Sequence, residues 1–290
     1  MTYLAIVREP FVRFSGDFLF EINPVVNLQV IVNFTVIAES DDWIVVDKPA
    51  PLIVHPANRK PEPTLLGGLE QLLAFEIQNG GCLGIITRLD RETSGLVLVA
   101  KHTQAARELG WIFERRQATK EYLAIVHGWP EVDEWECSAP IIRAGEIGPS
   151  EIWVRQIVNP LGRDCLTKFK VEQRFQQGNS KWSMIRCFPE TGRMHQIRVH
   201  LSHSGFPILG DKLYSGDGSE YLRWMADGWT DDLEKQLILS RHALHAAKLT
   251  IPWLGIPTGW QADLPVDMLE FAEGREITQT PEVVIWNRND

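Results

Sequence analysis

The chain has 290 residues, 44% hydrophobic and 23% charged, which is the composition of a folded protein with one large domain or two modest ones. Its apolar runs fall short of the roughly 18 residues that a membrane helix needs, and the N-terminus lacks a signal peptide's apolar core, so we expect a cytoplasmic protein without membrane contact. The four cysteines form no CxxC pair, which argues against structural zinc or a disulfide framework, and the net charge of −9 excludes a uniformly basic surface.

The N-terminal part of the chain combines strands with one helix. Residues 1–37 alternate loosely between apolar and polar side chains, which is typical of one or two strands. A short buried strand is predicted at 43–46, and the prolines at 49–63 indicate a loop. Thr64 can cap a helix that runs to Phe75, because leucines recur there at helical spacing.

The rest of the chain continues this mixture. A polar loop at 85–95 leads into the apolar strand 96–100, and Thr103 begins a second helix. The further strands that we expect are 120–127, 168–175, 183–188 and one that ends at Ile251, with a short helix from His195 to Leu201. Helices and strands do not alternate strictly, which predicts an α+β fold around a mixed, largely antiparallel β-sheet.

The first candidate for chemistry is Asp90, which lies between two arginines in the loop before strand 96–100. Neighbouring cations favour the charged form of a carboxyl group. A sheltered carboxylate can act as a nucleophile. The alternative is a structural aspartate that caps a turn and pairs with an arginine, and the composition of the loop alone favours that alternative.

A second candidate is the segment 190–203, in which histidines and arginines are concentrated. Such side chains form a surface that binds anions, although a solvated basic helix is as good an interpretation. The spacing contains no HExxH pattern, so we expect no metal. Residues 86–127 hold seven Lys/Arg against five Asp/Glu, and residues 181–215 hold five against two, so both candidates lie in basic stretches of an acidic chain.

The order of several motifs resembles the RluA family of pseudouridine synthases. Residues 88–101 (RLDRETSGLVLVAK) resemble the active-site motif of that family. The companion motifs are 45–50 (VVDKPA), 54–56 (VHP), 120–126 (KEYLAIV), 191–200 (TGRMHQIRVH), 207–211 (PILGD) and 244–246 (LHA), and the resemblance covers roughly residues 36–252. Thr87 stands where the family usually has His, and residues 1–35 are too few for the S4 RNA-binding domain of many relatives.

The resemblance implies roles for four residues. Asp90 is implied as the nucleophile, and Arg198 as its ion-pair partner, which fits the geometry of guanidinium and carboxylate. Tyr122 is implied to stack on the target base and to help remove the C5 proton. Leu249, or Leu244 in its place, is implied as the apolar wall under the base. Our own candidates for contacts with RNA phosphates are Arg88, Arg91, His195 and Lys212.

The resemblance also implies the overall function and organisation. The fold is expected to be a long mixed sheet with flanking helices and a central catalytic cleft. The expected activity is isomerisation of specific uridines to pseudouridine in a stem-loop of ribosomal or transfer RNA, by a monomer that needs no cofactor. We expect a short N-terminal strand extension (1–35), the catalytic domain (36–255) and an acidic C-terminal tail (256–290).

Two other functions remain as hypotheses. One is a non-catalytic RNA-binding or chaperone protein on the same fold, although the joint presence of Asp90, Tyr122 and Arg198 argues against it. The other is a glycoside hydrolase with Asp90 and Glu92 as its paired carboxylates. Retaining hydrolases hold their carboxyl groups about 5 Å apart, which a pair two residues apart reaches only in a special loop.

Overall fold

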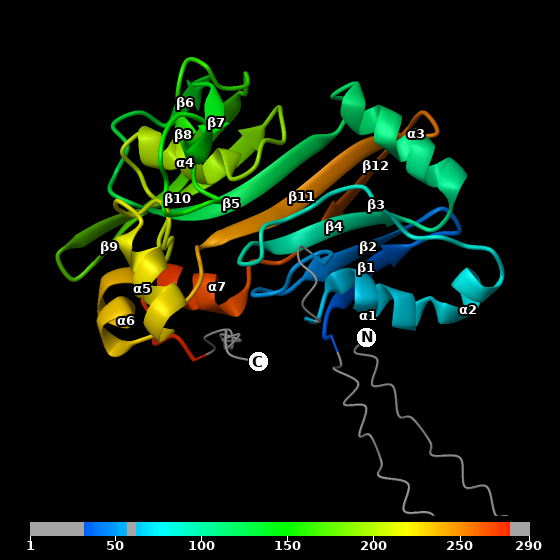
Figure 1. The fold of residues 1–290 in the computed structure, drawn as a ribbon, viewed down its shortest axis with the longest axis horizontal. Coiled ribbons are helices and arrows are strands. Elements are labelled where there is room, and N and C mark those ends of the chain that lie inside the picture. Colours follow the sequence, from blue (N-terminus) through cyan, green and yellow to red (C-terminus); the bar gives the residue numbers. More distant parts are fainter. Residues whose placement is uncertain (1–31, 57–61, 279–290) are drawn as a thin grey trace, which may run out of the picture.

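A long twisted β-sheet forms the centre of the computed structural model, which describes residues 32–56 and 62–278 (Figure 1). The strands predicted within residues 1–31 lie outside the described residues. Side by side, the strands are β1 (Thr35–Glu39), β2 (Trp43–Lys48), β4 (Ser94–Ala100), β11 (Leu244–Trp253), β5 (Thr119–His127), β10 (Ser180–Pro189), β9 (Thr167–Gln177) and β6 (Glu134–Cys137). β3 (Gly84–Ile85) pairs with β4, and β12 (Ile256–Gln261) pairs with β11.

Strands β4 and β11 run parallel to each other, whereas the other strand pairs of this sheet are antiparallel. The prediction of an α+β fold with a mixed, largely antiparallel sheet is therefore confirmed. A separate two-stranded sheet pairs β7 (Ile141–Arg143) with β8 (Gln156–Val158). No helix in the described part of the chain has the length and apolar character needed to cross a bilayer.

Strand β4 is buried along its whole length because helices cover both of its faces. Leu96, Leu98 and Ala100 pack with helix α3 (Thr103–Glu114) in one apolar cluster. Val97 and Val99, on the opposite face, pack with helix α1 (Leu65–Leu72) in another. This two-sided burial explains the continuous apolar run of the strand.

The helix predicted from Thr64 to Phe75 is two shorter helices. Thr64 caps α1, since its hydroxyl accepts a hydrogen bond from the Gly67 N–H at 2.9 Å. The chain bends at Leu73, and α2 (Ala74–Gln78) follows. The short helix predicted near His195 is α4 (Gln196–His203).

Three helices in the C-terminal third were not predicted from the sequence. Helices α5 (Ser219–Asp227) and α6 (Asp231–Leu237) lie in a segment rich in Asp and Glu, and α7 (Val266–Ala272) follows β12. We expected a separate tail from residue 256, but residues 256–278 pack with the rest of the fold. β12 extends the sheet, and Asp267 of α7 accepts two hydrogen bonds from Arg241, each 2.7 Å, at a buried position. The rest of that tail lies outside the described residues.

Candidate active site

A tight approach between β4 and β11 fixes the loop that carries Asp90. Gly95, at the start of β4, has a φ of +111°, a left-handed conformation that favours glycine. A Cβ atom at this position would lie 2.4 Å from the carbonyl oxygen of Ala246 in β11. The glycine therefore lets the two parallel strands meet where the loop that carries Asp90 ends.

Asp90 and Arg198 lie together, although 108 residues separate them in the chain. Nη1 of Arg198 donates a hydrogen bond to Oδ2 of Asp90 at 2.9 Å. The same guanidinium donates from Nε and Nη2 to the two carboxylate oxygens of Asp211, at 2.7 and 2.8 Å. Asp211 is fully buried and also accepts from the N–H groups of Leu213 and Tyr214. Arg198 is thus held in place by Asp211 and presents one nitrogen to Asp90.

The surroundings of Asp90 keep its carboxyl group ionised. Burial would raise its pKa, but the adjacent His195 and Arg198 and the hydrogen bond from Arg198 outweigh burial and hold the pKa below its ordinary value. Burial lowers the pKa of His195 to about 4, so this ring is neutral at neutral pH. Arg198 therefore supplies the lasting positive charge beside Asp90.

His195 lies beside Asp90, and hydrogen bonds on the other side of its ring hold it there. Its Nε2 lies 3.8 Å from Oδ2 of Asp90, and its Nδ1 lies 2.8 Å from the hydroxyl of Tyr214. That hydroxyl accepts a hydrogen bond from the Gln156 N–H at 3.0 Å, and we assign its own proton to Nδ1 of His195. The neutral ring then carries its proton on Nε2, which faces the carboxylate.

Tyr122 of β5 and Leu244 of β11 line the same pocket as Asp90. Tyr122 pairs with Ala246, and Leu244 pairs with Ala124, so the two side chains project from the same face of the sheet. Burial, and then the charge of Asp90, raise the pKa of the Tyr122 phenol well above its ordinary value. The phenol is therefore protonated at neutral pH.

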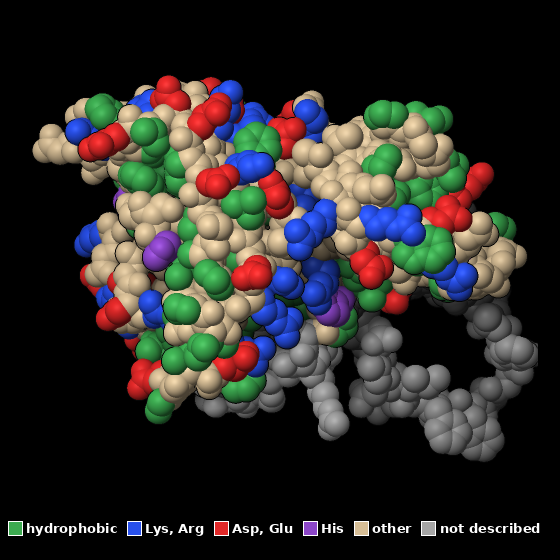
Figure 2. Space-filling model, turned by 90° about the horizontal axis from the view of Figure 1, so that it is seen from above, with side chains coloured by type: hydrophobic (Ala, Val, Ile, Leu, Met, Phe, Trp, Pro, Cys, Tyr) green, Lys and Arg blue, Asp and Glu red, His purple; other side chains and the backbone are tan. Residues whose placement is uncertain are grey.

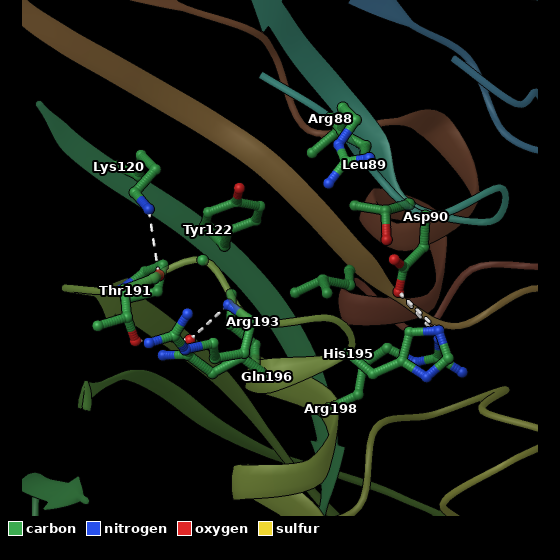
Figure 3. A pocket seen from close by; sticks show the side chains of 15 residues that line it. Arg88, Leu89, Asp90, Lys120, Tyr122, Thr191, Arg193, His195, Gln196 and Arg198 are labelled. Carbon is green, nitrogen blue, oxygen red and sulfur yellow. Dashed lines mark hydrogen bonds and ion pairs between the residues drawn. The ribbon is translucent and has the colours of Figure 1, made fainter. Parts of the chain in front are cut away.

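Figure 3 shows Tyr122 and Lys120 along one side of this pocket, with Asp90, His195 and Arg198 at its other end. The remaining lining residues are Arg88, Leu89, Thr93, Pro189, Thr191, Gly192, Arg193, Gln196, Ile197 and Leu244. Leu249 is absent from the lining. It lies five residues along β11 from Leu244, which is about 17 Å of strand, and packs in the apolar cluster of β4 and α3. Of the two leucines considered for the apolar wall, Leu244 therefore lines the pocket and Leu249 does not.

Besides Arg198, three cations line the pocket. Arg88, Lys120 and Arg193 are among its lining residues, and Arg88 is exposed. Lys120 donates to the carbonyl of Thr191 at 3.2 Å, and burial lowers its pKa. In the face seen in Figure 2, Lys and Arg side chains gather around a hollow between the two halves of the molecule. Local positive charge thus accompanies the pocket in a chain of net charge −9.

Besides His195, which bonds to Tyr214, two of the expected phosphate contacts have protein partners. Arg91 forms an ion pair with Glu62 at 2.8 Å, and its side chain is 36% exposed. Lys212 is only 2% exposed. Its Nζ lies 2.7 Å from Oε1 of Glu92, 5.1 Å from the ring centre of Trp224 and 5.5 Å from that of Trp229. Lys212 is therefore enclosed by protein side chains, which argues against the phosphate contact that we expected it to make.

Sequence reasoning missed the residues that hold the catalytic loop in place. Lys48 is fully buried and donates to three carbonyl oxygens, those of Pro49, Leu52 and Arg91. The hydroxyl of Thr93, three residues after Asp90, lies 2.7 Å from Nε2 of the buried His242. Lys48 belongs to the motif VVDKPA at residues 45–50, but no signal in the sequence pointed to His242.

A metal site was not expected, and the described residues contain no cluster of three or more His, Cys, Asp or Glu side chains that could hold an ion. The pocket instead combines an ionised carboxylate, a fixed guanidinium, a protonated phenol and surrounding cations. This combination suits covalent chemistry on a flat base that is attached to a phosphate backbone.

Comparison with known proteins identifies the class to which this fold and site belong. The family described as RNA pseudouridylate synthase matches residues 42–203, and the chain belongs to this family. It is 33% identical over 244 residues to "Ribosomal large subunit pseudouridine synthase D" of Escherichia coli O6:H1, which covers 82% of this chain and 69% of the relative. It is 34% identical over 239 residues to "Uncharacterized RNA pseudouridine synthase YlyB" of Bacillus subtilis, covering 81% and 70%.

The fold agrees with this assignment. The solved structure titled "Human RNA Pseudouridylate Synthase Domain Containing 4" superposes with a TM-score of 0.64 at 22% identity and covers 83% of this chain and 92% of its own. The predicted RluA-family membership and isomerase activity are confirmed: the protein is an RNA pseudouridine synthase. The glycoside hydrolase hypothesis has no support from these matches.

Proposed function

We propose that this enzyme isomerises specific uridines of large-subunit ribosomal RNA, with Asp90 as the nucleophile. The observation that carries the proposal is the Asp90–Arg198 contact of 2.9 Å within a pocket that Tyr122 and Leu244 also line. The ribosomal RNA as substrate rests on the names of the relatives, such as "Ribosomal large subunit pseudouridine synthase D". Transfer RNA, which the sequence left open, is the alternative substrate.

The reaction needs only a rearrangement within one nucleotide. The target uridine leaves its stack and enters the pocket. The Asp90 carboxylate adds to the sugar C1′ or to the uracil ring, and the bond between N1 and C1′ breaks. The base turns, C5 bonds to C1′, and the bond between the substrate and the Asp90 carboxylate breaks, which regenerates the carboxylate. The C5 proton leaves and N1 gains a proton. Atoms and electrons balance, so the chemistry requires no cofactor.

The pocket residues divide the remaining work. Arg198 keeps the nucleophile ionised and oriented, because Asp211 fixes the guanidinium. Tyr122 stacks on the base, and its protonated hydroxyl takes part in the movement of the C5 proton. Arg88, Lys120 and Arg193 bind the phosphates on either side of the target. We place the reaction in the cytoplasm. We also propose that the enzyme is a monomer, and size-exclusion chromatography with light scattering tests its oligomeric state.

The experiment is pseudouridine mapping after incubation of the purified protein with unmodified large-subunit ribosomal RNA or unmodified transfer RNA. Asp90→Asn is the test variant. Asp42→Asn is its matched control, since Asp42 pairs with His102 in a turn away from the pocket. We expect new pseudouridine only in the ribosomal RNA. We also expect Asp90→Asn to lose roughly a thousandfold or more in rate, as enzymes do without their nucleophile. Modification of transfer RNA alone would contradict ribosomal RNA as the substrate. An active Asp90→Asn variant would contradict Asp90 as the nucleophile.

A further inference from the structure

The small β7–β8 sheet exposes an aromatic side chain with a cation stacked on it. Trp153 lies in the turn before β8 and is 70% exposed. The guanidinium carbon of Arg143, from β7, lies 4.7 Å from the centre of its indole ring. Arg143 covers one face of the ring, and the high exposure leaves the opposite face open to solvent.

The stability of the fold does not explain this pair. A tryptophan with most of its surface in water contributes little by burial. Nε of Arg143 is covered, yet it has no hydrogen-bond partner in the described part of the chain. A covered donor without a partner costs stability. The arrangement is better explained by a ligand that uses the open indole face and the guanidinium.

The same unit carries three arginines without an ion-pair partner among the described residues. Residues 141–163 hold three arginines, Arg143, Arg155 and Arg163, and two glutamates. Within residues 32–56 and 62–278, none of the three arginines takes part in an ion pair. Exposed aromatic rings together with unpaired arginines are what proteins use to bind single-stranded nucleic acid.

This unit is attached directly to the catalytic pocket. The N–H of Gln156, the first residue of β8, donates to the Tyr214 hydroxyl, which bonds to His195 of the pocket. Trp153 precedes Gln156 by three residues, which span at most about 11 Å of chain. Trp153 is therefore close enough to meet the RNA beside the target uridine, but it is absent from the pocket that receives the target.

We propose that Trp153 and Arg143 form a binding site for an unpaired nucleotide that flanks the target uridine. The flanking base stacks on the open face of Trp153, and Arg143 pairs with the adjacent phosphate. Stacking accepts any base, so this site recognises the single-stranded character of the flanking RNA more than its sequence. The inference rests on the proposed function, because it names a second contact with the same RNA substrate.

The test compares Trp153→Ala with a matched control elsewhere on the surface. Trp111 of α3 is 47% exposed and has the guanidinium carbon of Arg115 at 5.9 Å from its ring centre. α3 lies in the other half of the molecule from β7 and β8 (Figure 1). Binding of large-subunit ribosomal RNA is measured in an Asp90→Asn background, so that affinity is independent of turnover. KM is measured with the same RNA in the active enzyme.

Loss of one base–aromatic stack weakens binding about tenfold. We expect that change in affinity and in KM for Trp153→Ala, a similar change for Arg143→Gln, and none for Trp111→Ala. Trp153→Phe retains a stacking ring and is expected to keep most of the affinity. Circular dichroism of each variant checks that a loss of affinity is not a folding defect. The proposal is overturned if Trp153→Ala and Trp111→Ala bind equally well. If the proposed function is wrong, the protein with native Asp90, Trp153 and Arg143 forms no pseudouridine in this RNA. That result differs from equal binding by the two alanine variants, so the two failures can be told apart.

Discussion

Asp211 accepts two hydrogen bonds from Arg198, at 2.7 Å from Nε and 2.8 Å from Nη2, and this contact directs Nη1 of Arg198 toward the catalytic loop. Both side chains are buried. Asp211→Asn removes the charge that compensates the guanidinium, which destabilises a buried pair by about 3–5 kcal/mol. We expect a loss of that size in urea unfolding, together with a lower single-turnover rate because Arg198 is no longer fixed.

Asp217→Asn is the matched control for this prediction. Asp217 lies six residues away at an exposed position, where it accepts a hydrogen bond from the Ser219 N–H. Its substitution is expected to change stability and rate little. Equal stability of the Asp211 and Asp217 variants would show that Asp211 does not hold Arg198.

Acid stability provides a second prediction, because buried histidines stay neutral in the folded protein. Burial lowers the pKa values of His195 and His245 to about 4, against about 6.5 in an unfolded chain. Between these values the unfolded state binds more protons, so stability is complete above about pH 6.5 and falls as the pH decreases toward 4. Each histidine costs up to about 3 kcal/mol by pH 4.

His245→Gln tests this pH dependence. His245 lies 3.0 Å from the Ser94 hydroxyl and bonds to the Ala262 carbonyl, and Gln can keep both contacts without titrating. The free energy of unfolding, measured from about pH 4.5 to 7.5, is expected to fall less steeply for the variant. Identical slopes for both proteins would mean that His245 has the same pKa in the folded and unfolded states.

The sequence was enough to predict that the proposed catalytic residues lie together, but not which residues support them. Asp90, Tyr122 and Arg198 each lie in a motif, and the order of the motifs was enough to bring them together. Lys212 and Glu92 are 120 residues apart, and a lysine in a loop has the same pattern whether it meets phosphate or protein. Only the packing of α5 and α6, which places Trp224 and Trp229 over Lys212, shows that it is enclosed.

Lys212 is enclosed, whereas Arg88 is exposed at the pocket. The salt dependence of RNA binding can show whether only Arg88 contacts a phosphate. Each phosphate contact contributes about one unit to the slope of log affinity against log salt concentration. We expect Arg88→Gln to reduce the slope by about one unit, since Arg88 is exposed at the pocket. Lys212→Met is expected to leave the slope unchanged while lowering stability. A reduced slope for Lys212→Met would restore the original interpretation.

Tyr122→Phe separates stacking from proton transfer. The ring remains, so RNA affinity is expected to stay the same, whereas kcat falls about a hundredfold if the hydroxyl acts on the C5 proton. Because the pKa of Tyr122 is raised, the pH profile of kcat for the tyrosine enzyme is expected to show no tyrosine ionisation below about pH 10. A Phe variant as fast as the tyrosine enzyme would limit Tyr122 to stacking.

Leu244 and Leu249 belong to the same strand and are nearly equally buried, at 4% and 3% exposure, yet only Leu244 lines the pocket. Replacing either with alanine removes a buried side chain and costs about 2–5 kcal/mol of stability. The two variants are expected to differ in activity, measured well below their unfolding temperatures. Leu244→Ala removes the wall beside the target base and lowers kcat/KM, whereas Leu249→Ala changes only the core between β4 and α3. A loss of kcat/KM confined to Leu249→Ala would return the wall to the position first predicted from the sequence.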